Sequence, residues 1–237
     1  FITEQSGIDN LKEEGKKENQ LYFVGNTMID TMVAYKDKIH ASPILQELGL
    51  GKDDFVLMTM HRPATVDHKQ ELIKLIELIE AITESDKLVF TIHPRTVNKL
   101  KHFDLYKRID GNKKVLLTEP MGYFAFQKLI SECRYILTDS GGIQEESTYQ
   151  RVPCLTLRPN TERPSTIETG SNTLVPFDLD EITRLIKLIK EDKYKKGRIP
   201  SLWDGNAAYR ILEALQEELY DGPSRPAITS KTKQLAK

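Results

Sequence analysis

The sequence predicts an α/β fold in which a Rossmann-like, doubly wound parallel sheet is covered by helices on both faces. Two observations support this prediction. Short apolar runs alternate with stretches of helical periodicity about six times along the chain, and a repeated strand–helix order requires right-handed crossovers between parallel strands. The apolar runs also lack the alternation of a half-exposed sheet, as expected for strands that are buried on both faces.

Seven apolar runs have the length and composition of strands. We expect strands at residues 22–24, 55–60, 87–92, 115–118, 135–138, 154–157 and 173–175. The clearest helix covers residues 72–82, whose leucines and isoleucines form a broad apolar stripe. Further helices are expected at residues 29–39, 96–103, 123–132, 143–150, 181–191 and 207–219.

The two ends of the chain suggest domain boundaries. The chain begins at Phe1 without a methionine, and residues 1–3 look like the end of a strand that leads into an amphipathic helix. We therefore expect residues 1–20 to be the end of an N-terminal domain that precedes this chain, together with a linker. Residues 21–220 then form the Rossmann-like domain. Residues 221–237, which contain prolines and scattered lysines, are expected to be a disordered tail.

Composition restricts the possible functions. The 237 residues are 39% hydrophobic and 29% charged, and their net charge of -1 predicts no nucleic-acid partner. Cys133 and Cys154 lie in apolar surroundings, which indicates buried thiols in a reducing compartment and hence a cytoplasmic protein. No apolar run approaches the ~20 residues that cross a bilayer, and no signal-peptide pattern is present, so no membrane association is expected.

The most informative stretch covers residues 135–146. An apolar run ends in Asp139, and Ser140, Gly141 and Gly142 then lead into a helix. Such a turn leaves the first amides of the helix unpaired, and glycine lets an anion approach the backbone, so the stretch predicts a site for a nucleotide diphosphate. Glu146, about a turn and a half into the helix, is placed to reach the diol of a ribose. The alternative is an ordinary strand-to-helix turn.

Two further strands end in a histidine and an arginine. His61 and Arg62 follow residues 55–60, and His93 and Arg95 follow residues 87–92. Arginine offers a fixed fork of donors and histidine a switchable one, so the pairs suit an anionic ligand at the carboxyl edge of the sheet. Solvated capping loops are the alternative. No metal is expected, because neither histidine has a carboxylate or cysteine at ligand spacing.

Two more residues are candidates for contacts with a nucleotide. Arg163 lies in a loop after residues 154–157 and could reach phosphate or sugar hydroxyls, or form a surface pair with a glutamate. Phe126 lies in the helix that follows residues 115–118 and could stack on a base or pack in the core. The chain contains no Gly-x-Ser-x-Gly, Walker-type or Gly-x-Gly-x-x-Gly motif, which argues against esterases, P-loop enzymes and NAD-dependent enzymes. No cofactor is expected.

These motifs occur together, and in the same order, in one known family. The chain resembles the non-hydrolysing UDP-N-acetylglucosamine 2-epimerases at residues 24–30, 59–62, 93–94, 137–146, 161–164 and 204–207. The matching segments span nearly the whole chain, and residues 139–146 with the downstream Glu-Arg-Pro are the most specific. The resemblance implies one half of a glycosyltransferase-B-type fold, with the active site between two Rossmann-like domains. This chain would be the C-terminal, nucleotide-holding domain.

The resemblance also implies roles for individual residues. His61 matches the family's functionally important histidine and is the expected catalytic residue, which would interact with the departing phosphate. The residues expected to bind the UDP-sugar are Ser140, Gly141, Gly142, Glu146, Arg163, Phe126, Arg62 and His93. The glycine turn would bind the diphosphate, Glu146 the ribose and Arg163 the phosphates or sugar, with Phe126 near the uracil.

The family reaction is an anti elimination of UDP followed by its re-addition with inverted configuration at C2, on the way to surface polysaccharide. The carboxylates that move the C2 proton lie in the family's N-terminal domain. The resemblance therefore implies that this chain binds nucleotide weakly and does not turn over substrate alone, and that the full-length protein is a homodimer.

One departure from the family pattern leaves the substrate open. Many members follow the His-Arg pair with Arg-Glu or Glu-Asn, whereas Pro63 and Ala64 follow it here. The sugar could therefore be UDP-N-acetylglucosamine or a related UDP-diacetamido uronic acid, and a second, regulatory UDP-sugar site is less well supported. The residues would also suit a glycosyltransferase of the same architecture or a simple nucleotide-binding module. The glycine turn together with the Glu-Arg-Pro segment favours the epimerase.

Overall fold

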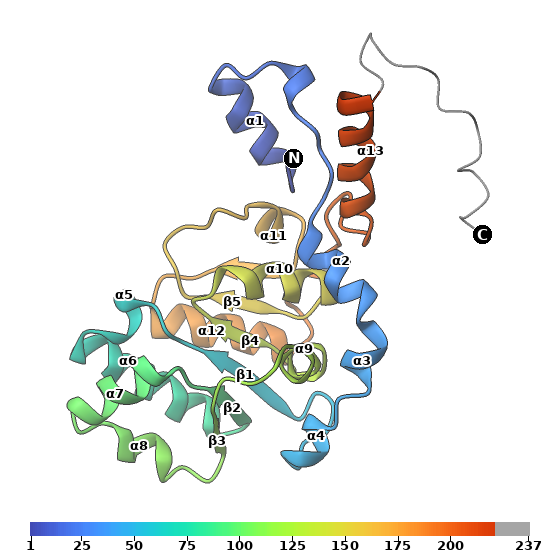
Figure 1. Ribbon diagram of the computed structural model, residues 1–237. Coiled ribbons are helices and arrows are strands. Elements are labelled where there is room, and N and C mark those ends of the chain that lie inside the picture. The colour runs from blue at the N-terminus through green and yellow to red at the C-terminus, as the bar shows by residue number, and fades with distance from the viewer. Residues whose placement is uncertain (221–237) are drawn as a thin grey trace.

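A six-stranded parallel sheet forms the centre of the computed structural model, which describes residues 1–220 (Figure 1). The strands are β1 (Phe55–Thr59), β2 (Lys87–Thr91), β3 (Val115–Thr118), β4 (Ile136–Thr138), β5 (Cys154–Thr156) and β6 (Asn172–Leu174). Their order in the sheet is β3-β2-β1-β4-β5-β6, and every neighbouring pair is parallel. The Rossmann-like fold expected from the sequence is confirmed. The tail expected at residues 221–237 lies outside the described residues.

Helices cover both faces of this sheet (Figure 1). Between the strands lie α5 (Pro63–Val66), α6 (Lys69–Thr83), α7 (Pro94–His102), α8 (Tyr106–Asp110), α9 (Tyr123–Glu132), α10 (Gly141–Gln150) and α11 (Ser165–Glu168). Before β1 lie α1 (Gln5–Glu13), the 3-10 turn η1 (Glu18–Gln20), α2 (Thr27–Ala34), α3 (Lys36–His40) and α4 (Ile44–Glu47). After β6 come α12 (Leu179–Lys190) and α13 (Ala207–Tyr220).

The strand residues divide the core into two apolar layers. In β1, Val56 and Met58 face a cluster that includes residues of α6 and α12, whereas Phe55 and Leu57 face a cluster with α9 and α10. This split follows from the two-residue period of a strand, which sends successive side chains to opposite faces. All four side chains are at most 1% exposed, which explains why the strands appear in the sequence as unbroken apolar runs.

The predicted strand at residues 22–24 is wrong. In this segment Phe23 forms only an isolated parallel bridge with Ile2, in which the Ile2 amide donates to Tyr22 O at 2.8 Å. Gly25 then adopts a φ of +89° and turns the chain into α2. The segment therefore connects α1 to the sheet domain but does not belong to the sheet.

The helix predicted at residues 29–39 is two helices. Tyr35 separates α2 from α3 with φ -107° and ψ 14°, and its ring contacts that of Phe124 at 5.4 Å between centroids. The short helices α4, α5 and α8 were not expected, since four or five residues are too few to show a helical period. The other predicted helices and strands are confirmed within two residues at each end, except that α6 begins three residues earlier.

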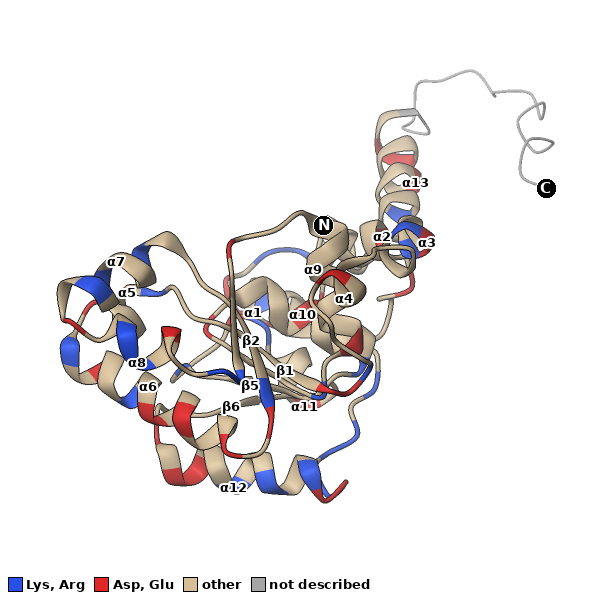
Figure 2. Cartoon of the chain, turned by 90° about the horizontal axis from the view of Figure 1, so that it is seen from below, with Lys and Arg blue, Asp and Glu red and all other residues tan. Residues whose placement is uncertain are grey.

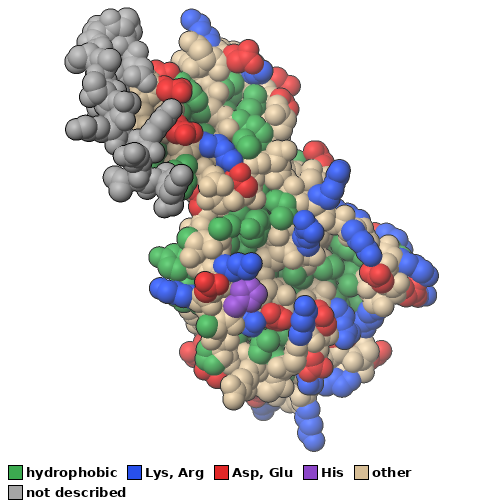
Figure 3. All heavy atoms as spheres, turned by 90° about the vertical axis from the view of Figure 1, so that its right-hand side faces the viewer, with side chains coloured by type: hydrophobic (Ala, Val, Ile, Leu, Met, Phe, Trp, Pro, Cys, Tyr) green, Lys and Arg blue, Asp and Glu red, His purple; other side chains and the backbone are tan. Residues whose placement is uncertain are grey.

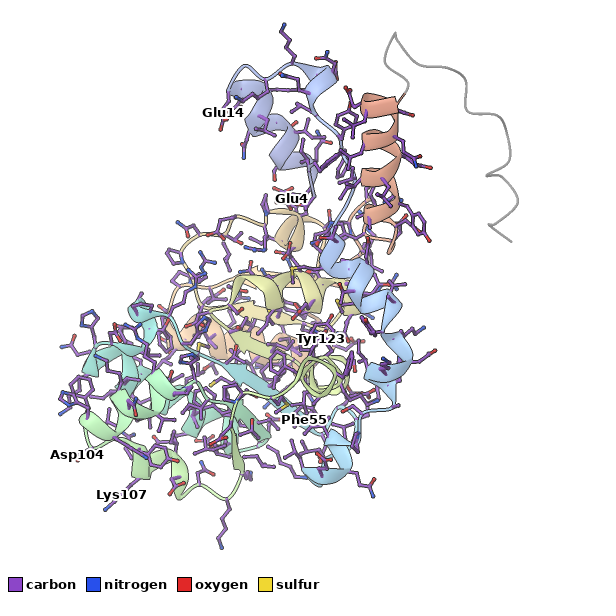
Figure 4. The ribbon with its side chains drawn as sticks, in the orientation of Figure 1. Glu4, Glu14, Phe55, Asp104, Lys107 and Tyr123 are labelled. Atoms are coloured by element: carbon purple, nitrogen blue, oxygen red, sulfur yellow. The ribbon has the colours of Figure 1, made fainter. Side chains whose placement is uncertain are left out.

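The last helix packs against the beginning of the chain. Just before this helix, the indole nitrogen of Trp203 donates to Thr3 O at 3.1 Å, and within it Arg210 Nη1 donates to Val24 O at 3.0 Å. The Glu4 carboxylate in turn accepts a hydrogen bond of 3.2 Å from the amide of Ser165, at the start of α11 (Figure 4). These contacts hold α1 and α13 to the sheet domain.

Charges of both signs lie on the outer helices α6, α8 and α12, whereas α7 carries only basic ones (Figure 2). Ion pairs connect some of these helices: Arg108 on α8 contacts Glu80 on α6 at 2.8 Å, and Arg95 on α7 contacts Asp67. Among residues 1–220, no helix combines the length and apolar character needed to span a bilayer.

Candidate nucleotide site

The order of the strands fixes where a ligand crevice opens. The chain runs from β1 outward to β2 and β3, and then returns to place β4 on the other side of β1. At such a switch point the loops after the two central strands diverge, and ligands bind beyond their carboxyl ends. The loop after β1 carries His61 and Arg62, and the loop after β4 carries Asp139 and Ser140. Two motifs that lie about 80 residues apart in the sequence therefore meet at one place.

The amino end of α10 has the form of an anion site. Ser140 is the N-cap residue, with φ -81° and ψ 141°, and its side chain accepts no hydrogen bond from the helix. The first amides of α10 therefore have no side-chain cap, and the positive end of the helix dipole lies at the same point. A phosphate group placed here would satisfy these amides.

Arg163 lies directly over this first turn. A Cβ atom added to Gly141 would lie 2.8 Å from Arg163 Nη1, so glycine makes room for the guanidinium. The guanidinium is held by two carboxylates: its Nε lies 2.9 Å from Glu145 Oε2, and its Nη1 lies 3.3 Å from Glu162 Oε2. At Gly142 the equivalent Cβ would be 3.5 Å from Met28 Cε, an ordinary contact. Predicted residues of two separate loops thus lie together.

Asp139 organises the opposite side of the turn. Its side chain is completely buried and accepts hydrogen bonds from the amides of His61, at 3.0 Å, and Arg62, at 2.8 Å. Its Oδ1 also lies 2.9 Å from His61 Nδ1. Burial acts to raise the pKa of Asp139, but the hydrogen bonds from His61 and Arg62 outweigh it and lower that pKa. The hydrogen bond to Asp139 raises the pKa of His61, against the effect of partial burial.

A pocket of about 210 Å³ opens beside this pair at the ends of β1 and β2. It is lined by Thr59, Met60, His61, Thr91, His93, Pro120, Ser140 and Ile143. The imidazole rings of His61 and His93 lie 6.0 Å apart in it. His93 Nδ1 accepts a hydrogen bond from the Arg95 amide at 3.1 Å, which leaves Nε2 as the donor of the neutral ring. Three predicted site residues therefore share one pocket.

The backbone amide of Arg62 donates to Asp139. The side-chain Nε of Arg62 is buried without a hydrogen-bond partner in the part of the chain that the structure describes. A buried guanidinium nitrogen of this kind suits an anionic ligand. Among residues 1–220, no group of three or more His, Cys, Asp or Glu side chains is arranged to hold a metal ion.

Glu146 lies on α10 where that helix contacts α9. Its side chain is nearly buried, and burial raises its pKa to about 7, while the neighbouring Gln127 amide lowers the pKa and Glu145 raises it. Phe126 is half-buried and packs against the α9 and α10 side of the core. The exposed aromatic side chains of this segment are those of Tyr123 and Phe124, at 38% and 37% exposure.

Sequence reasoning gave no role to Asp139 and Glu145. Asp139 could have been noticed, because a carboxylate directly after a fully buried strand needs backbone donors to compensate for its burial. Glu145 accepts a hydrogen bond of 2.9 Å from Asn26 Nδ2 and contacts Arg163, so it joins the segment before α2 to the glycine turn. Nothing in the sequence indicates that residues 119 positions apart form this contact.

Comparison with known proteins places this geometry in a family. A family model described as UDP-N-acetylglucosamine 2-epimerase matches residues 1–216. The UDP-N-acetylglucosamine 2-epimerase of Methanocaldococcus jannaschii is 39% identical over 222 residues, which are 91% of this chain and 60% of that protein. The UDP-2,3-diacetamido-2,3-dideoxy-D-glucuronate 2-epimerase of Pseudomonas aeruginosa is 32% identical over 227 residues, which are 91% of this chain and 58% of that protein.

The fold agrees with these sequence matches. The crystal structure of the Methanocaldococcus jannaschii enzyme in complex with UDP-GlcNAc and UDP superposes with a TM-score of 0.78 at 36% identity, over 90% of this chain and 60% of the solved one. The expected fold class, one half of a glycosyltransferase-B-type structure, is confirmed. The chain spans about 60% of the length of the relatives it matches. Because the family model matches nearly all of the described residues, the chain belongs to the UDP-N-acetylglucosamine 2-epimerase family.

Proposed function

We propose that this chain is the UDP-holding part of a UDP-N-acetylglucosamine 2-epimerase, an isomerase that interconverts UDP-N-acetylglucosamine and UDP-N-acetylmannosamine. The observation behind the proposal is the uncapped amino end of α10, which lies between the Arg163 guanidinium and the His61–Asp139 pair. This site offers helix amides and a cation on one side and a histidine of raised pKa on the other. Such groups can stabilise a diphosphate both as a leaving group and when it adds back to the sugar.

Each predicted residue takes one part of the nucleotide in this proposal. The amides of Ser140, Gly141 and Gly142 bind the diphosphate, and Arg163 neutralises its charge. Glu146 accepts hydrogen bonds from the ribose hydroxyls. The sugar lies near the side chains of Arg62 and His93, and the uracil lies near Phe126, in the first turn of α9.

His61 is the catalytic residue of the proposed reaction. In the elimination, the C2–H bond and the bond between C1 and the diphosphate oxygen break, and UDP leaves with the electron pair of the latter. A protonated His61, held by Asp139, stabilises the charge that develops on the departing diphosphate. In the return step UDP adds to C1 again, and the proton returns to C2 from the other face. The carboxylates for this proton transfer belong, in this proposal, to a further domain.

The surface around α13 supports the proposal of a further domain. Four large apolar side chains of α13 are exposed, namely Tyr209 at 70%, Leu212 at 57%, Leu215 at 39% and Leu219 at 58%. Figure 3 shows hydrophobic side chains at the surface on this side of the molecule. Exposed apolar patches of this kind mark contact sites, and relatives are longer than this chain. We propose that residues 1–20 are the end of this further domain and its linker, that α13 contacts the domain, and that the longer protein is a homodimer.

Two measurements test the function. Isothermal titration of UDP into these 237 residues should show weak, saturable binding, and incubation with UDP-N-acetylglucosamine should give no epimer. The two-domain protein in deuterated water, with no acceptor sugar added, should incorporate deuterium at C2. The absence of exchange with every UDP-2-acetamido sugar tried would show that the epimerase proposal is wrong.

A second candidate substrate is a UDP-2,3-diacetamido uronic acid. It is favoured by the 32% identity to the Pseudomonas aeruginosa enzyme and by Pro63 and Ala64 after the His-Arg pair. Comparing the rate of C2 exchange for the two sugars separates these candidates. A glycosyltransferase would instead require an acceptor and would show no C2 exchange.

A further inference from the structure

Two pairs of side chains face each other across the contact between α9 and α10. Tyr123 and Gln127 are four residues apart on α9, and Glu146 and Gln150 are four residues apart on α10, so each pair lies on one face of its helix. The two helices pack together, and Tyr123 is labelled in Figure 4 at the start of α9. The ribose carboxylate proposed above is thus one corner of a four-residue polar group between helices.

Gln127 is oriented within this group. Its side-chain oxygen accepts a hydrogen bond of 2.9 Å from Gln150 Nε2, so its amide nitrogen is directed the other way. That nitrogen is buried and has no hydrogen-bond partner within residues 1–220, and the residue is only 1% exposed. A buried donor without a partner is costly, unless an acceptor reaches it in the functional state. Glu146 lies one turn before Gln150 on the same face of α10, and Gln150 contacts Gln127, so the Glu146 carboxylate is the candidate acceptor for this nitrogen.

We infer that Gln127 is a positioning residue for Glu146. In this inference, which rests on the proposed ribose role, the Gln127 amide donates to one carboxylate oxygen and leaves the other free for the ribose hydroxyls. Gln150 fixes the orientation of the amide. A carboxylate so nearly buried needs a donor to remain ionised, and the ionised form accepts hydrogen bonds from both ribose hydroxyls. The titratable groups beside Glu146 are Tyr123 on α9, whose pKa Glu146 raises, and Glu145 on its own helix, which raises the pKa of Glu146.

The test is the affinity for UDP-N-acetylglucosamine from about pH 6 to about pH 9, measured by calorimetry on this chain. This ligand is suitable because its diphosphate diester does not titrate near neutral pH. Gln127→Leu removes the donor at nearly constant volume and should raise the pKa of Glu146. If the pKa of Glu146 rises by about one unit, the affinity should fall about fivefold at pH 7. At the alkaline end of the range it should recover toward the wild-type value.

Three variants make the result specific. Gln150→Leu should weaken binding less than Gln127→Leu and should have no further effect in a Gln127→Leu background, because both act through the same amide. Gln46→Leu, on the exposed surface of α4, is the matched control and should change nothing. Glu146→Gln should weaken binding at every pH.

The outcomes separate the inference from the function on which it rests. An affinity that Glu146→Gln leaves unchanged overturns the ribose role itself. If Glu146→Gln weakens binding while Gln127→Leu does not, only the positioning role of Gln127 is overturned. A loss in Gln127→Leu that is equal at all pH values indicates damage to the packing of α9 on α10, and it also overturns the inference.

Discussion

His61 and Asp139 form a pair across the switch point of the sheet, with His61 Nδ1 only 2.9 Å from a carboxylate oxygen of a completely buried aspartate. The same carboxylate accepts the backbone amides of His61 and Arg62. One side chain from the loop after β4 therefore fixes both the backbone and the imidazole of the loop after β1. This arrangement directs His61 Nε2 away from Asp139 and leaves it free for a ligand.

Replacing the Asp139 carboxylate should change both the pKa of His61 and the stability of the fold. Asp139→Asn should lower the pKa of His61 and cost about 2–4 kcal/mol in the free energy of unfolding, since a buried acceptor of three hydrogen bonds becomes a partly mismatched amide. NMR titration of the histidine ring and urea unfolding measure the two effects. Asp104→Asn, at an exposed site with positive φ, is the control. An unchanged His61 pKa would contradict the pairing.

The contribution of the pair should depend on pH. The pKa of Asp139 is lowered in the folded chain, so its contribution is present above the unfolded value and is lost as the pH falls through the folded value. The pKa of His61 is raised, so its contribution is present below its unfolded value and is lost as the pH rises through the folded value. The difference in stability between wild type and Asp139→Asn should therefore be largest between about pH 4 and about pH 6.5. A difference that is constant across a wider range, from about pH 3 to about pH 9, would show that the pair contributes no charge interaction.

The fold could be predicted because its signals are local. Fully buried strands such as β1 appear as apolar runs, and α6 shows its stripe over fifteen residues. The carboxyl-edge rule then places His61 and Ser140 at one end of the sheet. The sequence could not show that β1 and β4 are neighbours, because the strand order depends on how the crossovers pack.

The contacts that sequence reasoning missed are long-range. Asp139 belongs to the glycine turn by sequence, but its partners lie 77 and 78 positions away. Phe23 looks like a strand residue by composition, yet Ile2 is its bridge partner and the sheet lies elsewhere. Composition describes how well a segment fits a sheet, whereas tertiary contacts decide whether a partner strand is available.

Glu146 should limit the stability of the fold. Burial raises its pKa to about 7 from an ordinary value of 4.5, so the unfolded chain binds fewer protons between these values and stability falls as the pH rises through them. Glu146→Gln should therefore raise the free energy of unfolding by about 2–3 kcal/mol above pH 7 and have little effect near pH 4. Urea unfolding at the two pH values checks this. Equal effects at both would rule out the buried charge as the cause.

The two glycines of the turn should respond differently to alanine. In Gly141→Ala the new methyl must displace the Arg163 guanidinium, whereas in Gly142→Ala it meets only Met28 at ordinary distance. Because a guanidinium is the flexible end of its side chain, Gly141→Ala should change the free energy of unfolding by less than about 1 kcal/mol. UDP affinity should nevertheless fall about tenfold, through the loss of a charge-assisted contact.

The control for this prediction is a cycle with Arg163→Ala. If Gly141→Ala acts by moving the guanidinium, the two substitutions together should weaken UDP binding no more than Arg163→Ala alone. Additive losses would instead mean that the methyl group blocks the phosphate directly.

Asn26 connects the start of α2 to the glycine turn, and its replacement should weaken both stability and UDP binding. Its Oδ1 accepts the Met28 amide at 2.9 Å as the N-cap of α2, and its Nδ2 donates to the buried Glu145 at 2.9 Å. Asn26→Ser keeps a capping oxygen but loses the donor to Glu145, while Asn26→Ala loses both. We expect losses of about 1–2 kcal/mol for serine and about 1 kcal/mol more for alanine, measured by urea unfolding. Since Glu145 also holds Arg163, both variants should weaken UDP binding to the same extent, although they differ in stability. If UDP affinity instead fell in step with stability across the two variants, the result would mean that Asn26 acts on the site by capping α2 and not through its contact with Glu145.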